Sequence, residues 1–433
     1  MSKKIIFQKA TRIEGNASIQ IEVDNGSVKT ARFLVQEFRG FESFVRGTRV
    51  EYVPHMVSRI CGLCSTAHQV ASIKAIEEAL GVQTPRSVSA LREIQVLGEW
   101  INSHALSYFF LTMPDFVGAS SGIFELLQSH PEIAKEAFAL RDAGLKIVRL
   151  LGRRTSHPVT TGVGRFCAEP DETDINEIRS IASDVGERSL RLIKQIGDFH
   201  LTSKSIAFPS DQQINFVAYD GEQGKDIFCV YNQAGNLELS FSRAEFMDNI
   251  SELRTDWTLA KFPYLTNYGF PAGIMLVGPL SRSYQENSFL HDPDLTNLDL
   301  AGMLRDRTSL TLESSDACRL LEIHWAAKKI LHLLDEVDLA QMSAEVDMKA
   351  SGQGIGVLEA PRGILLHSYI VNQGRIERMR LMVATQFNNA YINLLLRDLA
   401  EKHLSGDSIS PEGEKLIGRC VRIFDPCLSC ATH

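Results

Sequence analysis

Four of the eight cysteines form two pairs, one near each end of the chain. Cys61 and Cys64 make the first C-x-x-C motif, and Cys427 and Cys430 make the second, three residues before the terminal His433. Residues i and i+3 on a turn point to the same side, so each pair can offer two thiolates to one metal ion. Together the pairs supply four soft sulfur ligands. The commonest use of such a set is a structural zinc site.

The separation of the two pairs argues against a zinc ribbon. Ribbons usually place their pairs about 15 to 20 residues apart, whereas almost the whole chain lies between Cys64 and Cys427. A thioredoxin-like redox pair is disfavoured as well, because neither motif lies in a βαβ pattern. The remaining four cysteines stand singly and are expected to be small buried hydrophobes: Cys167, Cys229, Cys318 and Cys420.

Composition narrows the class of protein further. The chain has 433 residues and a formal net charge of -8, which disfavours nucleic acid as a partner. No run approaches the 18 apolar residues of a membrane span. The N-terminal sequence MSKKIIFQKATRIEG has no apolar core of a signal peptide. A cytoplasmic location is expected, with export on a signal-bearing partner left open.

The elements that must position these cysteines begin with β structure in about residues 1–40. Ala17, Ile19, Ile21 and Val23 alternate with polar residues before the turn signal Asp24-Asn25-Gly26. Hydrophobic spacing then predicts a long helix from Ser87 toward Leu111, and further helices over 131–153, 172–201, 309–338 and 378–403. A small β excursion is expected over 214–241.

These elements predict a mainly α protein with small β regions, an α+β fold. The helical core is expected over about 85–205 and 305–405, and the metal-binding segment over 420–433. No internal repeat and no linker divides the chain, so a single interwoven unit is expected.

Five motifs, in order, resemble the catalytic large subunit of nickel-iron hydrogenases. They are Arg12-Ile13-Glu14-Gly15, Arg39-Gly40-Phe41-Glu42, Arg59-x-Cys61-Gly-x-Cys64-x-x-x-His68, Ala360-Pro361-Arg362-Gly363 and Asp425-Pro-Cys427-x-x-Cys430-x-x-His433. The resemblance spans the chain, although residues 165–345 contribute little to it. It implies the large-subunit fold, a long-helix bundle with an N-terminal antiparallel sheet. It points to the cytoplasmic, bidirectional group that couples hydrogen to a soluble carrier such as NAD(P) or ferredoxin.

The resemblance implies the metal ligands. Cys61 and Cys427 would be terminal nickel ligands, and Cys64 and Cys430 would bridge nickel to an iron that carries carbon monoxide and cyanide. Electron-rich thiolates suit this chemistry, because they stabilise changes of nickel oxidation state and can accept the proton from split hydrogen.

Glu14 and Arg362 would act beside the metals. The resemblance makes Glu14 the proton relay next to Cys427, against the alternative of a solvated acid. It places Arg362 over the open coordination site, bound to Asp425, where its five fixed donors suit a cyanide nitrogen. Without the motif, Arg362 would be an ordinary turn arginine.

Five further residues are assigned by the resemblance. Thr385 would donate to the other cyanide, and His68 would hydrogen-bond a bridging sulfur; otherwise both are ordinary helical residues. Glu42 and His433, with the backbone carbonyl of Leu381, would bind magnesium or a similar ion near the C-terminus. The alternatives are a surface acid for Glu42 and a frayed terminal residue for His433.

Two positions depart from the family pattern, and neither is a metal ligand. Asn16 stands where a histidine is common, and Ser103 stands where many members have an aspartate near the arginine. Family members are often trimmed after the final histidine once nickel is bound, so an extension beyond His433 stays an open question.

The resemblance also implies partners. No cluster-binding motif remains once four cysteines bind nickel and iron, so a small subunit with iron-sulfur clusters is expected, together with diaphorase-type subunits. Dihydrogen and protons would be the substrates. The alternatives are a non-catalytic scaffold like the quinone-site subunit of complex I, which lacks the four cysteines, and a structural four-cysteine zinc protein.

Overall fold

The N-terminal residues form an antiparallel sheet in the order β1-β2-β3. The structure is a computed structural model, and it describes residues 4–119, 122–202, 205–209, 212–221 and 225–433. The strands are β1 (Lys4–Lys9), β2 (Ala17–Asp24) and β3 (Ser27–Val35). Every second residue of β2 is buried, and Asn25 and Gly26 take the positive φ angles of a tight turn. The predicted sheet and its turn are confirmed.

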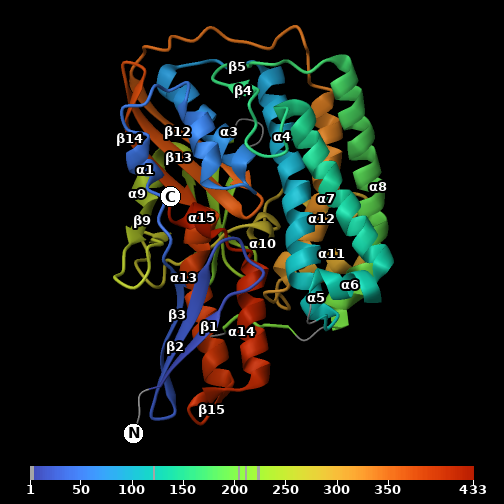
Figure 1. Ribbon diagram of the computed structural model, residues 1–433, viewed down its shortest axis with the longest axis vertical. Coiled ribbons are helices and arrows are strands. Elements are labelled where there is room, and N and C mark those ends of the chain that lie inside the picture. The colour runs from blue at the N-terminus through green and yellow to red at the C-terminus, as the bar shows by residue number, and fades with distance from the viewer. Residues whose placement is uncertain (1–3, 120–121, 203–204, 210–211, 222–224) are drawn as a thin grey trace.

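A bundle of long helices makes the other side of the molecule (Figure 1). It contains α4 (Arg86–Ala105), α7 (Pro131–Gly152), α8 (Glu172–Thr202) and α12 (Ser314–Leu334). The helix α4 continues through a π-helical segment (Leu106–Thr112) into α5 (Met113–Phe116), as the apolar spacing toward Leu111 predicted. The helices predicted over 131–153 and 172–201 are confirmed, whereas the one predicted over 309–338 is shorter.

The prediction of helix through about 305–405 is wrong between 352 and 383. There the chain forms an antiparallel sheet of β12 (Gly352–Ala360), β13 (Gly363–Asn372) and β14 (Arg375–Val383). The helix predicted over 378–403 therefore begins only at Ala384, as α13 (Ala384–Lys402). Pairing of β14 with β13 overrides the helix-favouring arginines and methionines and Leu381 within residues 375–383.

The helix α3 (Ser65–Leu80), which follows Cys64 directly, packs on β12 at very close range. Gly352, Gly354 and Gly356 face the backbone carbonyls of Ala79, Ala75 and Ala71, and a Cβ on any of these glycines would overlap the facing oxygen. Strand residues two apart thus match helix residues four apart. This contact holds α3, which directly follows the first cysteine pair, against β12, and Arg362 lies in the turn that follows β12.

A four-stranded sheet confirms the β excursion predicted over 214–241. Its order is β11-β6-β7-β8, with β6 (Asn215–Asp220), β7 (Ile227–Tyr231), β8 (Leu237–Ser242) and β11 (Met275–Leu276). The remaining short elements are α1 (Phe41–Phe44), α2 (Val53–Val57), the 3-10 turn Ser58–Ile60, α6 (Ile123–Ser129), β4 (Thr161–Gly162), β5 (Arg165–Phe166), the 3-10 turn Arg243–Glu245, α9 (Phe246–Asn249), β9 (Ile250–Leu253), β10 (Phe262–Leu265), α10 (Pro279–Arg282), the 3-10 turn Phe289–His291, α11 (Asp299–Arg305), β15 (Leu404–Ser405) and β16 (Ser408–Ile409).

The C-terminus lies beside α15, close to α1 and the sheet of β12, β13 and β14 (Figure 1). The helix α14 (Pro411–Phe424) ends at Asp425, which has a left-handed φ of 49°. Pro426 then prevents the helix from continuing, and the chain turns into α15 (Leu428–Ala431). Every residue from Cys420 to His433 is buried, so the segment predicted to bind metal is enclosed by protein.

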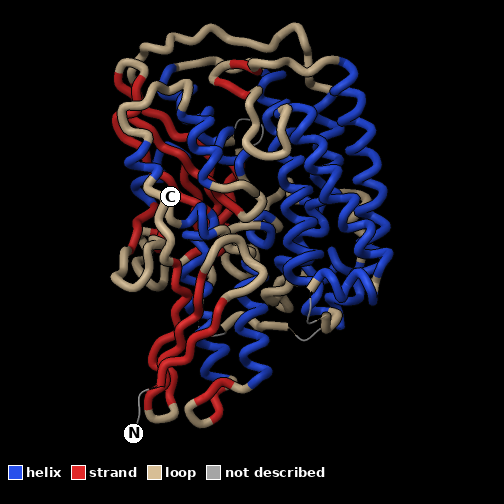
Figure 2. Tube along the Cα trace, viewed as in Figure 1, coloured by secondary structure: helices blue, strands red, loops and turns tan. Residues whose placement is uncertain are grey.

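Helices predominate on the bundle side and strands on the opposite side (Figure 2), so the predicted α+β class is confirmed. Of the helices in the described part of the chain, none combines the length and the apolar character needed to cross a bilayer.

Candidate metal centre

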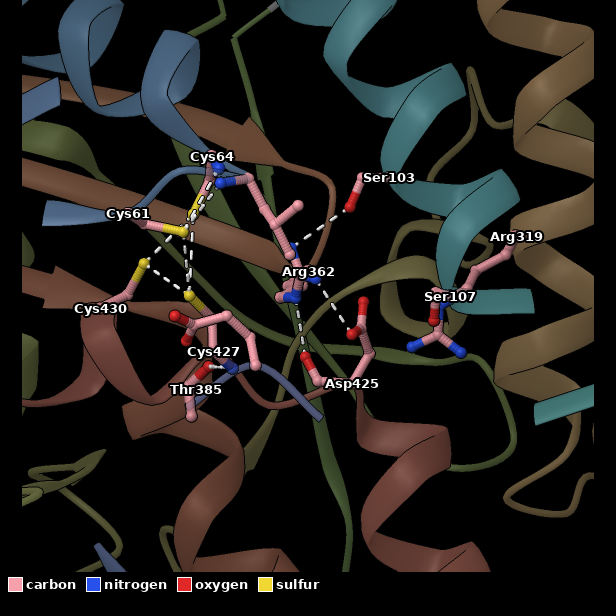
Figure 3. Close-up of polar contacts among 12 residues, drawn as sticks. Cys61, Cys64, Ser103, Ser107, Arg319, Arg362, Thr385, Asp425, Cys427 and Cys430 are labelled. Carbon is pink, nitrogen blue, oxygen red and sulfur yellow. Dashed lines mark hydrogen bonds and ion pairs between the residues drawn. The ribbon is translucent and has the colours of Figure 1, made fainter. Parts of the chain in front are cut away.

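The two cysteine pairs meet, although they come from opposite ends of the chain (Figure 3). Cys61 and Cys64 flank the turn before α3, and Cys427 and Cys430 flank the turn into α15. Their sulfur atoms lie 2.9 Å apart for Cys427–Cys430, 3.1 Å for Cys64–Cys430, 3.3 Å for Cys61–Cys427 and 3.8 Å for Cys64–Cys427. All four are buried. The structure thus brings the four predicted ligands into one cluster.

The chemistry of this cluster fits metal binding. Burial raises the pKa of the Cys427 and Cys430 thiols well above the ordinary value, so an unmetallated cluster does not readily hold several negative charges. Metal cations supply the missing positive charge and release the thiol protons on binding. Of the other four cysteines, Cys229, Cys318 and Cys420 are buried as expected; Cys167 is exposed, which corrects its prediction.

Arg362 lies in the turn between β12 and β13 and contributes a buried positive charge beside the cysteines. Its Nε donates to the backbone oxygen of Asp425 at 2.7 Å, and its Nη2 donates to the Asp425 carboxylate at 3.0 Å. Its Nη1 donates to Ser103 Oγ at 3.2 Å. Ser103, which departs from the family pattern, therefore still binds Arg362, through a neutral hydroxyl group.

A cavity opens against the sulfurs of Cys64, Cys427 and Cys430. Arg362 and Thr385 line it together with apolar residues such as Pro361 and Leu365. Thr385 Oγ1 accepts the Cys427 N–H at 2.9 Å, so the hydroxyl proton is left to donate elsewhere. Because His68 also lines it, the cavity combines three polar side chains with apolar walls.

His68 begins a buried chain of hydrogen bonds that leads away from the sulfurs. His68 Nε2 lies 3.3 Å from Cys430 Sγ, and its Nδ1 lies 3.1 Å from His367 Nε2. His367 Nδ1 lies 2.9 Å from the Tyr369 hydroxyl, which donates to Ser72 Oγ at 2.9 Å. Burial lowers the pKa of His68 to about 4 and also lowers that of His367 well below its ordinary value. Both rings are therefore neutral at physiological pH.

Glu14 lies in the loop between β1 and β2 and reaches the second cysteine turn. Its backbone pairs with Cys427 in an isolated parallel bridge. Its carboxylate accepts the Ser429 N–H at 3.0 Å and the Ser429 hydroxyl at 2.5 Å. Arg39 Nη2 donates to the same Ser429 hydroxyl at 3.0 Å. Two of the sequence motifs thus converge on one residue of the cysteine turn.

Glu42, Leu381 and His433 also lie together. The Leu381 N–H donates to Glu42 Oε1 at 2.9 Å, and His433 Nε2 is 3.5 Å from the same oxygen. Lys261 Nζ lies 3.7 Å from Glu42 Oε2. Burial alone would raise the pKa of Glu42, but the hydrogen bond and charge of His433 outweigh it and lower this pKa to about 2. His433 is buried and held by Cys430 O at 2.7 Å, so it is not a frayed terminal residue.

Two functional neighbours are absent from the sequence prediction. Glu99 on α4 accepts the N–H groups of Thr66 at 2.8 Å and Ala67 at 3.1 Å, so its carboxylate caps the start of α3 just after Cys64. Burial raises the pKa of Glu99 to about 8. His367 has no assigned role in the sequence, yet it contacts His68. Neither residue lies in a recognisable motif, so only the packing of α4 and β13 reveals them.

Comparison with known proteins places the chain in a family. Residues 39–174 and 272–433 match the family described as nickel-dependent hydrogenase, and residues 4–38 match one described as HoxL-like. One relative belongs to the vhu F420-non-reducing hydrogenase of Methanocaldococcus jannaschii and is 32% identical, over 89% of this chain and 96% of the relative. The beta subunit of the NAD-reducing hydrogenase HoxS from Cupriavidus necator is 28% identical, over 100% of this chain and 95% of the relative.

Solved structures agree with this assignment. An NAD+-reducing NiFe hydrogenase in its H2-reduced state superimposes with a TM-score of 0.84 and 27% identity, with full coverage of both chains. A NiFeSe hydrogenase from D. vulgaris Hildenborough has the same fold, with a TM-score of 0.78 and 22% identity. The family implies that the cysteine cluster holds a nickel-iron centre, which the four buried thiols fit. The chain belongs to the nickel-dependent hydrogenase family and is the catalytic large subunit of a nickel-iron hydrogenase.

Proposed function

We propose that this chain catalyses the reversible reaction of dihydrogen to two protons and two electrons at the cysteine cluster. Cys61 and Cys427 would hold nickel, and Cys64 and Cys430 would bind both nickel and iron. The bound metals supply the heterolytic cleavage of dihydrogen. The observation that carries this proposal is the convergence of four buried thiols from both chain ends, with sulfur atoms no more than 3.8 Å apart along the hydrogen-bonded pairs.

Glu14 moves the proton between the cysteine turn and solvent. The β-bridge to Cys427 holds the Glu14 backbone beside the sulfur-bearing residue, and Ser429 orients the carboxylate through two hydrogen bonds. Glu14 is only half-buried, so part of the residue is exposed to solvent. A carboxylate in such a position can accept and return a proton.

Arg362 and Thr385 orient the diatomic ligands of the iron, one carbon monoxide and two cyanides. Both side chains line the cavity next to Cys64 and Cys430, and each would donate a hydrogen bond to one cyanide. Asp425 balances the charge of Arg362 and fixes its plane. The apolar walls suit carbon monoxide and exclude water. His68 forms a hydrogen bond with the Cys430 sulfur through Nε2 and so fixes the orientation of this bridging ligand.

A magnesium or similar ion binds between Glu42, His433 and the Leu381 carbonyl. The carboxylate and imidazole already face each other across 3.5 Å. The N–H and C=O of a residue in an antiparallel strand point to the same side, and the Leu381 N–H points at Glu42. Such an ion would fix the buried terminus and, with it, Cys430 in α15.

The electrons leave through a small subunit that carries iron-sulfur clusters. In the described residues, the four remaining cysteines form no second cluster, so an acceptor must come from a partner chain. The relative named as an NAD-reducing hydrogenase subunit supports a soluble carrier such as NAD(P) or ferredoxin. We expect this carrier to be reached through diaphorase-type subunits in the cytoplasm. We expect the single interwoven chain to require this partner for stability.

Metal analysis joined to infrared spectroscopy tests the proposal. We expect about one nickel and one iron per chain and infrared bands from carbon monoxide and cyanide, which have almost no other source in a protein. Stoichiometric zinc without nickel would instead support a structural four-cysteine site. Quinone binding by a metal-free but assembled chain would support a scaffold role like that in complex I.

A further inference from the structure

Arg282, at the end of α10, is a buried arginine whose donors are all engaged. Its Nε and Nη2 bind both oxygens of Glu322 at 2.7 Å each. Its Nη1 binds Glu359 Oε2 at 2.9 Å and Ala360 O at 3.0 Å, and its Nη2 also binds Pro361 O at 3.0 Å. A guanidinium has five N–H donors, so this network uses every one of them.

The two backbone oxygens that Arg282 holds come directly before Arg362. The hydrogen bonds to Ala360 and Pro361 therefore fix the turn from which the Arg362 side chain extends toward the cysteines. The opposite side of the turn is equally confined, because a Cβ on Gly278 would lie 2.7 Å from the Arg362 carbonyl oxygen. The turn cannot shift without breaking one of these contacts.

The network around Arg282 is itself rigid. The guanidinium lies over the Trp100 ring at 4.2 Å, a favourable cation–π distance. Burial alone would lower the pKa of Arg282, but Glu322 and Glu359 outweigh this effect and raise it. Glu322 Oε2 also lies 2.9 Å from His104 Nε2. Such a fully bonded ionic network specifies one geometry.

We propose that Arg282 is a positioning residue for the reaction, acting by holding the Ala360–Pro361 backbone so that Arg362 faces the metal centre. This inference rests on the proposed role of Arg362. No charge from Arg282 has to reach the metals, because its effect passes through the backbone of the turn. Its partners Glu322 and Glu359 serve to hold the guanidinium in place.

The variant Arg282→Lys tests this role without leaving a buried carboxylate pair unneutralised. Lysine keeps the charge but has three donors on a flexible stem, so it cannot bind both glutamates and both carbonyls. We expect the assembled holoenzyme to keep nickel and iron, to show shifted cyanide bands, and to lose turnover by about 10-fold to 100-fold, as misplaced catalytic groups do.

A matched control is Arg92→Lys. Arg92 is also buried, binds both oxygens of Glu77 at 2.8 and 2.9 Å, and donates to Gly162 O at 2.8 Å. These hydrogen bonds hold a part of the fold other than the turn at residues 360–363. The control should lower thermal stability but leave the cyanide bands at their wild-type positions, which separates a general packing defect from a shift of the Arg362 turn.

A double-variant cycle identifies the route of the effect. If Arg282 acts through Arg362, then Arg282→Lys should lower the turnover of the Arg362→Lys enzyme by no more than about 2-fold, because coupled residues are not additive. Full additivity would overturn the inference. Wild-type turnover and bands in Arg282→Lys would overturn it as well. If Arg362→Lys itself has wild-type turnover, it is the proposed role of Arg362 that fails.

A milder variant keeps the test decisive if Arg282→Lys does not acquire both metals. Glu359→Gln leaves the bidentate pair with Glu322 intact and weakens the contact at Nη1, while the amide oxygen can still accept the Tyr219 N–H that binds Glu359 Oε1. A smaller shift of the same cyanide bands in this variant would support the inference. Unchanged bands together with an unmetallated Arg282→Lys would overturn it, because the arginine would then serve folding alone.

Discussion

The backbones of Glu14 and Cys427 run side by side as an isolated parallel β-bridge, and the next amide, Leu428 N–H, donates to Glu14 O at 3.3 Å. The proposed proton carrier and the proposed nickel ligand are thus placed by main-chain pairing. Because Gly15 has a φ of 85° and a Cβ there would lie 2.9 Å from the Leu428 Cβ, only glycine lets the two loops approach so closely.

Replacement of the acid at position 14 should separate proton transfer from assembly. Glu14→Gln keeps a side chain that can accept from Ser429 but cannot carry the proton. We expect normal nickel and iron content, unchanged infrared bands and a loss of hydrogen turnover by about 100-fold or more. Turnover is measured in both directions with a soluble acceptor and donor.

The control for this variant is Glu37→Gln in the neighbouring loop, where Glu37 Oε1 accepts from Asn16 Nδ2 at 2.8 Å. It removes an acid close to the same surface but away from Cys427, and turnover should stay within about 2-fold of wild type, as is usual for partly exposed sites. Near-normal turnover of Glu14→Gln in both directions would mean that the proton leaves by another route.

Replacement of a metal ligand should impair metal loading itself, a step that precedes proton transfer. Cys427→Ser exchanges a soft sulfur for a hard oxygen, so nickel content should fall well below one per chain and the carbon monoxide and cyanide bands should weaken. Cys420→Ser is the control, because Cys420 is equally buried in α14 but lies outside the cluster. It should destabilise the chain modestly and retain both metals. Full nickel loading of Cys427→Ser would reject Cys427 as a ligand.

The sequence predicted the cluster better than its surroundings. The C-x-x-C spacing identifies Cys61, Cys64, Cys427 and Cys430 directly, because local geometry points each pair to one side. The sequence does not indicate the roles of Glu99 and Arg282, because a single acid or arginine within an ordinary helix carries no local signal. Their roles come from contacts with Thr66 and with the turn before Arg362, which only the folded chain brings near.

The error in secondary structure has a similar cause. Residues 375–383 favour a helix by type, yet Leu381 pairs opposite His367 and the strand is completed by β13. By contrast, the hairpin at Asn25-Gly26 was predictable, because the turn and the alternation that flanks it are both local. The glycines at 352, 354 and 356 alternate with period two, a pattern typical of a strand with one face closely approached, so β12 does carry a local signal that β14 lacks.

That glycine row gives a prediction about stability. Gly354→Ala would place a methyl group onto the Ala75 carbonyl oxygen, so β12 and α3 must separate, and unfolding free energy should fall by about 1 to 3 kcal/mol or more, as in overpacked cores. The control is Gly302→Ala in α11, where a Cβ meets no atom within 4 Å among the described residues. It should stabilise the chain by about 0.5 to 1 kcal/mol. Equal melting temperatures of the two variants would contradict the close packing.

The acid sensitivity of the enzyme should trace in part to Glu322. Burial alone would raise its pKa, but the charge and hydrogen bonds of Arg282, together with the hydrogen bond from His104, lower it to about 2. A carboxyl group whose pKa is lower in the folded state stabilises the fold above its unfolded pKa of 4.5 and loses this contribution as the pH falls toward 2. The stabilisation at neutral pH is of the order of 3 kcal/mol by linkage.

Glu322→Gln should therefore lower the melting temperature of the holoenzyme at pH 7, and its difference from wild type should shrink as the pH falls from about 5 to 3. Glutamine cannot titrate, so the variant has no such acid-linked loss at this position. The control Glu187→Gln removes an exposed acid 3.8 Å from Arg191, and it should shift the melting temperature little at any pH. The difference in melting temperature between Glu322→Gln and wild type could instead stay constant from pH 7 to pH 3. That result would show that Arg282 and His104 do not stabilise the charged form of Glu322.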